Sequence, residues 1–125
     1  MKTTQPMTLD NIFSYLQSPP PRYINPEIAV CYILAVLLEG DSYGSHLVKQ
    51  ISKTYPTYRL SETVLYSAIT FLIEEGLIIS YQQKAEGRGR PRQMYRLKES
   101  AQGKARELAQ MGTHYLSSAN LAQAA

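Results

Sequence analysis

The residues best suited to a specific chemistry form one short run, because positions 88–92 read Arg-Gly-Arg-Pro-Arg. Guanidinium groups donate to phosphate oxygens, and narrow A·T-rich minor grooves attract inserted arginines because their negative potential is enhanced. Glycine lets a backbone approach a duplex closely, and proline keeps it extended. The run therefore predicts contact with a nucleic acid. The candidate contact residues in this region are Lys84, Arg88, Gly89, Arg90 and Arg92.

The positive charge of the chain is concentrated around this run. Residues 84–98 contain six basic side chains and one acidic one, a net charge of +5. The remainder of the 125 residues holds seven bases and nine acids, a net charge of −2. A local cationic patch indicates a polyanionic partner, whereas a general basic drift would mainly affect solubility. Residues 88–92 also match the core of the AT-hook motif.

Residues that could carry catalysis are few and scattered. His46 and His114 are isolated, and no carboxylate pair, Cys/His cluster or phosphate-binding glycine motif occurs in the sequence. We therefore expect no enzyme activity, no cofactor and no metal site. Cys31 is the single cysteine, which predicts a buried thiol in a reducing cytosol. The N-terminus lacks the apolar block of a secretory signal, and no apolar run is long enough to span a membrane, so we expect a cytoplasmic protein.

Two helices are predicted at the start of the central region. The first spans residues 25–40, which are nearly all apolar between Asn25, the expected N-cap, and the terminating Gly40. The second follows almost directly over residues 42–55, with Ser42 as its expected cap. Because so few residues separate them, the two helices should form a tight, angled pair.

A third helix is predicted over residues 61–76, from Ser61 as N-cap to Gly76 as terminator. Its expected buried stripe comprises Leu65, Ala68, Ile69, Leu72 and Ile73. The opposite face is rich in hydroxyl groups, whereas a merely solvated face would more often carry Lys and Glu. The candidate DNA contacts on this helix are Ser61, Glu62, Thr63, Tyr66, Ser67 and Thr70.

Two short strands are predicted on either side of the basic run. Residues 77–83 and 94–98 are rich in β-branched and aromatic side chains, and the Gly/Pro/Arg loop between them favours a hairpin. The order of three helices, a strand, a basic loop and a strand is typical of a winged helix-turn-helix. The expected fold is therefore mainly α with a small β-hairpin.

Each end of the chain is predicted to add a helix. Residues 8–16 have apolar side chains at helical spacing, and the proline-rich residues 18–23 favour an extended connector. This first helix is either a frayed terminus or a segment that docks on the domain or on a partner subunit. Residues 100–125, with Ser100 as a candidate cap, carry a stripe that either packs on its own domain or pairs with a second copy. The stripe residues assigned to the dimer are Leu108, Met111, Tyr115 and Ala119.

The chain divides accordingly into residues 1–24, 25–99 and 100–125, of which the middle part is expected to bind double-stranded DNA. The third helix fits the major groove, and its N-terminus offers N–H donors to a phosphate. The basic hairpin would reach an adjacent minor groove. A dimer would place two such helices about 34 Å apart on an A·T-rich, pseudo-palindromic promoter site.

Several segments resemble the PadR family of bacterial winged-helix transcriptional regulators. The resemblance covers about residues 28–110 and is carried by SYGSHLVKQI, LSETVLYSAITFLIEEGLI and GRGRPRQMYRL. It implies a nucleoid-associated homodimer that binds DNA and usually represses genes, with the C-terminal helical region in the dimer interface. It implies DNA contacts for Tyr66 and its neighbours and for the arginines of the basic loop. Within the family, a short domain with an extra N-terminal helix is similar to the cyanobacterial clock-associated Pex-like group, which implies repression of a clock gene.

Three other interpretations stay open at the level of sequence. A winged helix can serve as a protein–protein assembly module, although clustered like charges are rare at protein interfaces. Double-stranded RNA is a less suitable partner because its major groove is deep and narrow. Some relatives in the PadR family respond to small aromatic ligands, and the ten tyrosines of this chain would suit such a repressor.

Overall fold

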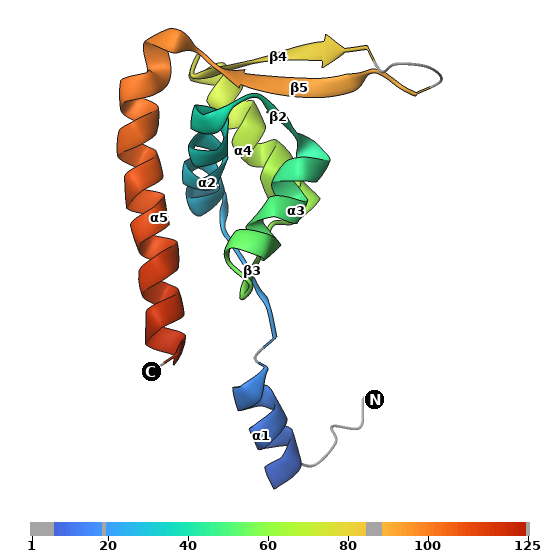
Figure 1. Cartoon of the computed structure of the whole chain (residues 1–125), viewed down its shortest axis with the longest axis vertical. Coiled ribbons are helices and arrows are strands. Elements are labelled where there is room, and N and C mark those ends of the chain that lie inside the picture. The colour runs from blue at the N-terminus through green and yellow to red at the C-terminus, as the bar shows by residue number, and fades with distance from the viewer. Residues whose placement is uncertain (1–6, 19, 85–88, 125) are drawn as a thin grey trace.

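The computed structural model describes residues 7–18, 20–84 and 89–124, which form five α-helices and a small amount of sheet (Figure 1). The helices are α1 (Leu9–Gln17), α2 (Pro26–Glu39), α3 (Gly44–Thr54), α4 (Glu62–Glu74) and α5 (Gln102–Ala124), the last preceded by a 3₁₀ turn, Glu99–Ala101. The strands are β1 (Arg22–Tyr23), β2 (Ser42–Tyr43), β3 (Tyr58–Arg59), β4 (Ile78–Gln83) and β5 (Arg92–Leu97). The predicted winged helix-turn-helix with an added helix at each end is confirmed.

Side-chain caps fix the starts of the two longest helices of the winged domain. The Asn25 side chain accepts a hydrogen bond from the Ile28 N–H at 2.9 Å, and Ser61 Oγ accepts one from the Val64 N–H at 3.2 Å. These caps satisfy N–H groups that have no partner within the helix, so both predictions are confirmed. Gly76 follows α4 with φ 73°, a left-handed conformation that glycine adopts readily.

Two other expected helix caps are wrong. Ser42 does not cap a helix but lies buried in β2, and α3 begins two residues later at Gly44. Ser100 is inside the 3₁₀ turn that precedes α5 rather than at its cap. Gly40 ends α2 as predicted, with a φ of 157°, a positive value that glycine adopts readily.

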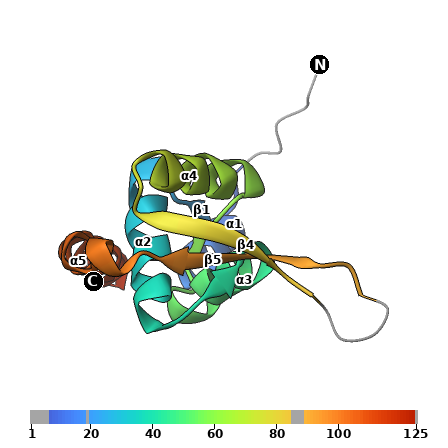
Figure 2. The ribbon, with the colours of Figure 1, turned by 90° about the horizontal axis from the view of Figure 1, so that it is seen from above.

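The core is built around α2, which packs against both α4 and α5 (Figures 1 and 2). Its buried residues are Ala29, Tyr32, Ile33, Leu34 and Leu37. The Tyr32 hydroxyl donates to the Leu47 carbonyl at 2.6 Å, which ties α2 to α3. Burial raises the pKa of Tyr32, so the hydroxyl keeps its proton and remains a donor.

The inner face of α4 agrees with the predicted stripe except at its end. The buried residues are Leu65, Ala68, Ile69 and Leu72. Ile73 was expected among them, but its side chain is 41% exposed. The helix stops at Glu74, and the last turn presents Ile73 to solvent instead of to α2.

A three-stranded antiparallel sheet in the order β2-β5-β4 carries the hairpin. The predicted hairpin is confirmed, with Tyr81 opposite Met94 and Ser80 opposite Tyr95. Strand β2 adds two further pairs to β5, Ser42 with Tyr95 and Tyr43 with Met94. A separate parallel pair joins β1 to β3, so the segment before α2 is hydrogen bonded to the segment before α4.

Helix α5 packs along α2 through small side chains. The buried residues on this face of α5 are Ala105, Ala109, Gly112 and Leu116. Gly112 lies against Cys31 of α2, because a Cβ on this glycine would stand 2.4 Å from the Cys31 Cβ. Cys31 is half-buried rather than fully buried, and burial still raises the pKa of its thiol.

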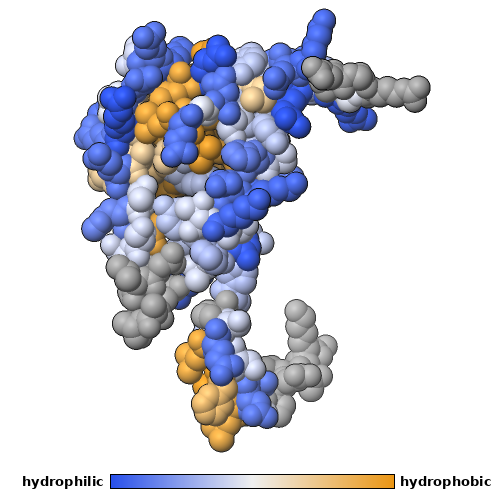
Figure 3. All heavy atoms as spheres, viewed as in Figure 1, coloured by the Kyte–Doolittle hydropathy of each residue, from blue (hydrophilic) through white to orange (hydrophobic). Residues whose placement is uncertain are grey.

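Helix α1 lies apart from the winged domain, below it in Figure 1. Thr8 Oγ1 caps the helix by accepting a hydrogen bond from the Asn11 N–H at 3.1 Å. All its residues are exposed, and apolar side chains stand on its surface in Figure 3. The large apolar ones among them are Leu9, Ile12, Phe13 and Leu16. In the described part of the chain, no helix has the length and apolar character that a membrane crossing requires.

Candidate nucleic-acid interface

The outward face of α4 consists of the residues expected from the sequence. Glu62, Thr63, Tyr66, Ser67 and Thr70 are exposed. Ser61 is half-buried, and its hydroxyl oxygen is used by the cap on α4. The first turn of the helix leaves backbone N–H groups that can donate to an anion. This face can therefore bond phosphates or base edges through hydroxyl and backbone groups.

The hairpin presents its cationic side chains to solvent. Lys84, Arg90 and Arg92 are exposed, as is Gly89 beside them. Arg88 was predicted as a contact and lies outside the described residues. Strands β4 and β5 extend beyond the helices on the side away from α5, as the wing of a winged helix does (Figures 1 and 2).

Arg92 stacks on an aromatic ring at the base of α3. Its Cζ lies 3.9 Å from the centroid of the Tyr43 ring, a distance typical of a cation–π contact. A guanidinium that stacks by its face keeps its N–H groups at the edge, where they can still donate to phosphate. The contact therefore orients Arg92 without blocking its hydrogen-bonding capacity.

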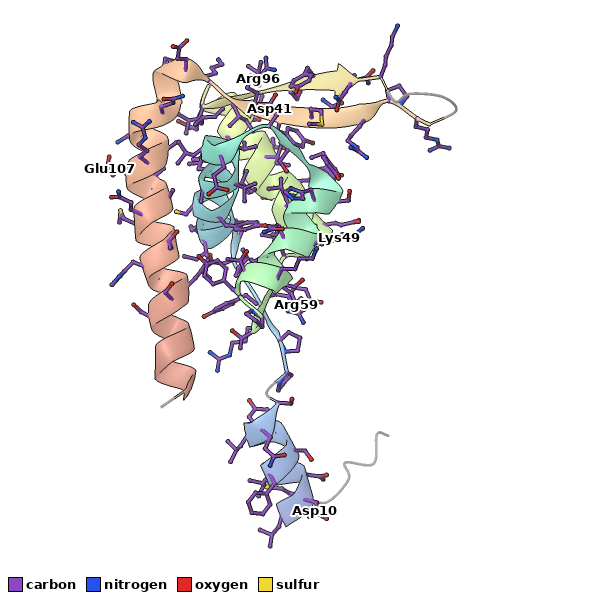
Figure 4. All side chains as sticks on the ribbon, viewed as in Figure 1. Asp10, Asp41, Lys49, Arg59, Arg96 and Glu107 are labelled. Atoms are coloured by element: carbon purple, nitrogen blue, oxygen red, sulfur yellow. The ribbon has the colours of Figure 1, made fainter. Side chains whose placement is uncertain are left out.

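An acidic residue holds the inner end of the hairpin. Arg96 forms an ion pair with Asp41, with 2.9 Å between Nη2 and Oδ2 and 3.0 Å between Nε and Oδ2 (Figure 4). The Tyr81 hydroxyl donates to the same carboxylate, and the Arg96 guanidinium lies 4.8 Å from the Tyr81 ring centroid. The hydrogen bond from Arg96, and to a smaller extent the one from Tyr81, holds the pKa of the Asp41 carboxyl below its usual value. Sequence reasoning missed this cluster, since its members are 40 and 55 residues from Asp41.

The two histidines lie beside serines in different parts of the fold. His46 Nδ1 is 2.7 Å from Ser42 Oγ, and its ring packs near Tyr43 with 5.7 Å between centroids. His114 Nε2 is 3.5 Å from Ser118 Oγ on α5. The first pair joins β2 to the first turn of α3, next to the base of the hairpin.

The face of α4 and the hairpin meet at the β2–α3 junction. Tyr66 Oη lies beside Gly44, 3.5 Å from the position that a Cβ on this glycine would take. Gly44 directly follows Tyr43, on which Arg92 stacks. In Figures 1 and 2 the N-terminal end of α4 and the outer ends of β4 and β5 lie on the same side of the domain, opposite to α5. The exposed Lys49 on α3 adds a positive charge toward that side (Figure 4).

This geometry agrees with known proteins. A family model described as the transcriptional regulator PadR-like family matches residues 33–107. The chain belongs to this PadR-like family. The matched region of the PadR-like chain includes α3, α4 and both strands of the hairpin. PadR-family transcriptional regulators bind DNA, typically as dimers.

Solved structures extend the match over nearly the whole chain. The circadian clock associated protein Pex from Anabaena is 46% identical, with 91% of this chain and 99% of that chain covered and a TM-score of 0.79. Pex from Synechococcus sp. is 48% identical, with coverages of 88% and 98% and a TM-score of 0.82. A transcriptional regulator from Clostridium thermocellum is 30% identical, with coverages of 75% and 91% and a TM-score of 0.60. Among proteins with curated descriptions, none matches.

Tyr66→Phe tests whether the α4 face of this PadR-like protein contacts DNA. The Tyr66 side chain is 53% exposed, so loss of its hydroxyl should leave the melting temperature almost unchanged. Affinity for duplex DNA should fall about three- to tenfold if the hydroxyl bonds to the duplex. Fluorescence anisotropy and thermal unfolding measure the two quantities. Tyr23→Phe, at an exposed tyrosine of β1, is the control. A large drop in melting temperature would instead identify Tyr66 as a stabilising residue.

Proposed function

We propose that this chain binds A·T-rich, pseudo-palindromic promoter DNA as a homodimer and represses transcription. Helix α4 would enter the major groove, and the hairpin would place its arginines in an adjacent minor groove. Occupation of the promoter would then exclude polymerase. The observation that carries this proposal is that the N-terminal end of α4 and the outer ends of the hairpin strands lie on the same side of the domain (Figure 2), and that the hydroxyl residues of α4 and the cations of the hairpin are exposed.

The proposed target is a promoter of the circadian clock system. Support comes from the two cyanobacterial structures that are 46% and 48% identical, since both are proteins named Pex and the Anabaena one is described as circadian clock associated. Both matches include nearly the full length of those proteins, so the likeness is not confined to the shared DNA-binding fold. No ligand is required by this proposal, and a cytoplasmic location follows from it.

A titration of duplex DNA tests the proposal. The purified protein is mixed with A·T-rich and random duplexes at about 50 to 200 mM salt, and affinity and stoichiometry are recorded. If the dimer neutralises roughly 6–10 phosphates, affinity should fall by about 10³–10⁵ over this range. Two chains per duplex and a preference for the A·T-rich sequence support the proposal. Equal indifference to both duplexes would favour a protein–protein assembly module instead.

The dimer contact is proposed to include the exposed stripe of α5. Met111 is 65% exposed and Tyr115 is 54% exposed, whereas Leu108 is half-buried against the core. The Ala119 side chain, also assigned to this stripe, lies outside what the structure describes. Large apolar side chains at three- and four-residue spacing on an outward helix face suit a second copy of the same helix.

Met111→Glu tests this contact. A charge buried in a dimer interface lacks a partner, so we expect the dimer dissociation constant to rise at least about tenfold. Sedimentation analysis measures the dissociation constant, and the DNA titration should show a matching loss of cooperative binding. The control is Gln110→Glu, which adds the same charge at the neighbouring exposed position of α5. A dimer that withstands Met111→Glu as well as Gln110→Glu would place the interface elsewhere.

A further inference from the structure

Asp41 lies at the point where the hairpin joins the helices. It precedes β2 and contacts one residue from each strand of the hairpin, Tyr81 on β4 and Arg96 on β5. In Figure 4 Asp41 and Arg96 lie side by side at this junction. We propose that Asp41 is a positioning residue that fixes the angle of the wing relative to α3 and α4. This inference rests on the proposed function in so far as the wing is taken to contact DNA.

The backbone alone gives the hairpin little support along its length. Strand β2 pairs with β5 only at Tyr95 and Met94 within the described residues, while the hairpin continues to Gln83 and Arg92. A two-stranded ribbon without a third strand or a helix to pack on is marginally stable in water. Side-chain contacts must therefore hold the direction of its outer half.

The contacts that hold the hairpin share one face of the sheet. Side chains alternate along a strand, so Arg92 and Arg96 point to the same face of β5 as Met94, the residue opposite Tyr81. Asp41 binds Arg96 and Tyr81 at the inner end of this face, and Tyr43 stacks with Arg92 further out. The segment 41–43 thus contacts the hairpin at two points along its length. Two points of contact fix a direction, whereas one would leave a pivot.

These contacts are exposed, so they serve orientation more than stability. The side chains of Arg96 and Asp41 are 55% and 28% exposed, and such ion pairs add little to the free energy of unfolding. The orientation of the wing depends more strongly on these contacts than the free energy of unfolding does, because a wing that enters a groove must be held within a small range of positions. A modest loosening at the base becomes a larger displacement at the tip.

The sign of the effect on DNA binding separates this proposal from simple electrostatics. Asp41→Asn removes a negative charge near a polyanion and releases the Arg96 guanidinium, and both changes alone would strengthen binding. Loss of the positioning contacts should weaken it. We expect about three- to tenfold lower affinity for the A·T-rich duplex, because a displaced wing makes fewer of its hydrogen bonds to the groove.

The experiment compares Asp41→Asn, Tyr81→Phe and the control Glu39→Gln in the same titration. Glu39 is an exposed acid two residues before Asp41, so its replacement removes an equal charge without touching the hairpin. Affinity should fall for Asp41→Asn and Tyr81→Phe and stay equal or rise for Glu39→Gln. In a background that carries both Arg96→Gln and Tyr81→Phe, Asp41→Asn should have little further effect, since both partners of Asp41 are already lost.

A second measurement needs no DNA. Amide hydrogen exchange in the outer hairpin, residues 80–83 and 92–94, should be faster in Asp41→Asn than in the wild type, while exchange in α2 and α4 should be unchanged. Equal exchange in the two proteins, or affinity that is unchanged or higher in Asp41→Asn, would overturn the proposal. A wild-type protein that fails to bind either duplex would instead refute the proposed function, and the exchange measurement would still decide the role of Asp41.

Discussion

Replacement of both Arg90 and Arg92 by alanine is expected to lower the affinity for duplex DNA by about a hundredfold at roughly 0.1 M salt. Both side chains are exposed on the hairpin, and stacking on Tyr43 orients Arg92 without consuming its N–H groups. Each phosphate contact that is lost removes about 0.9 from the slope of log affinity against log salt. The double variant should therefore bind more weakly on all sequences and depend less on salt, as measured by titration across salt concentrations.

A charge-matched pair controls for the loss of net charge in this experiment. Lys104 and Arg106 are exposed on α5, on the side of the domain opposite to the hairpin (Figure 1). Their double replacement by alanine lowers the net charge by the same amount but should change affinity by less than about threefold, because distant exposed charges are screened. An equal loss of affinity in the two double variants would show that the wing has no special role.

Gly112→Ala is expected to destabilise the fold by about 1–3 kcal/mol, although alanine is the better helix former. The added Cβ would lie 2.4 Å from the Cys31 Cβ and 3.6 Å from the Cys31 Cα. Both atoms are anchored to backbones, so no side-chain rotation can relieve the clash and α5 must move away from α2. Denaturant unfolding should show a lower midpoint, and Met111 and Tyr115 on the outer face of α5 should be displaced with the helix.

The same helix provides the control. Gly103 is a helical glycine of α5 with nothing within 4 Å of the position of an added Cβ. Gly103→Ala should therefore stabilise the protein by about 0.5–1 kcal/mol through helix propensity and a reduced unfolded-state entropy. Cys31→Gly removes the atom that clashes, so it should cancel most of the steric penalty of Gly112→Ala in a double-mutant cycle. Stabilisation by both glycine replacements would contradict the close packing of α5 on α2.

The features that could be predicted from the sequence are those with local causes. Asn25 and Ser61 cap helices because their side chains reach N–H groups three residues ahead, a relation visible in the sequence. The hairpin was predictable because two β-branched and aromatic segments flank a Gly/Pro/Arg loop. The exposed hydroxyl face of α4 followed from the helical period alone.

The features that could not be predicted depend on long-range partners. Strand β2 is two residues long, too short for a periodic pattern, and Ser42 joins a strand because β5 lies beside it. The Asp41 cluster joins residues 40 and 55 positions apart. One signal was available, since a hairpin of this length needs a third strand or a helix to support it. The polar Gly-Asp-Ser segment before α3, predicted only as the end of one helix and the cap of the next, was the stretch that could supply one.

Helix α2 packs against both α5 and α4, which has a consequence for the proposed dimer. Protein cores are closely packed and transmit displacements. Because α2 contacts both neighbours through its core residues, a tilt of α5 would also shift α4. In the proposed dimer, the angle at which the two α5 helices pack would then set the distance between the two α4 helices, and with it the spacing of the half-sites. Substitutions in α5 could therefore change the preferred half-site spacing although these residues make no contact with DNA bases.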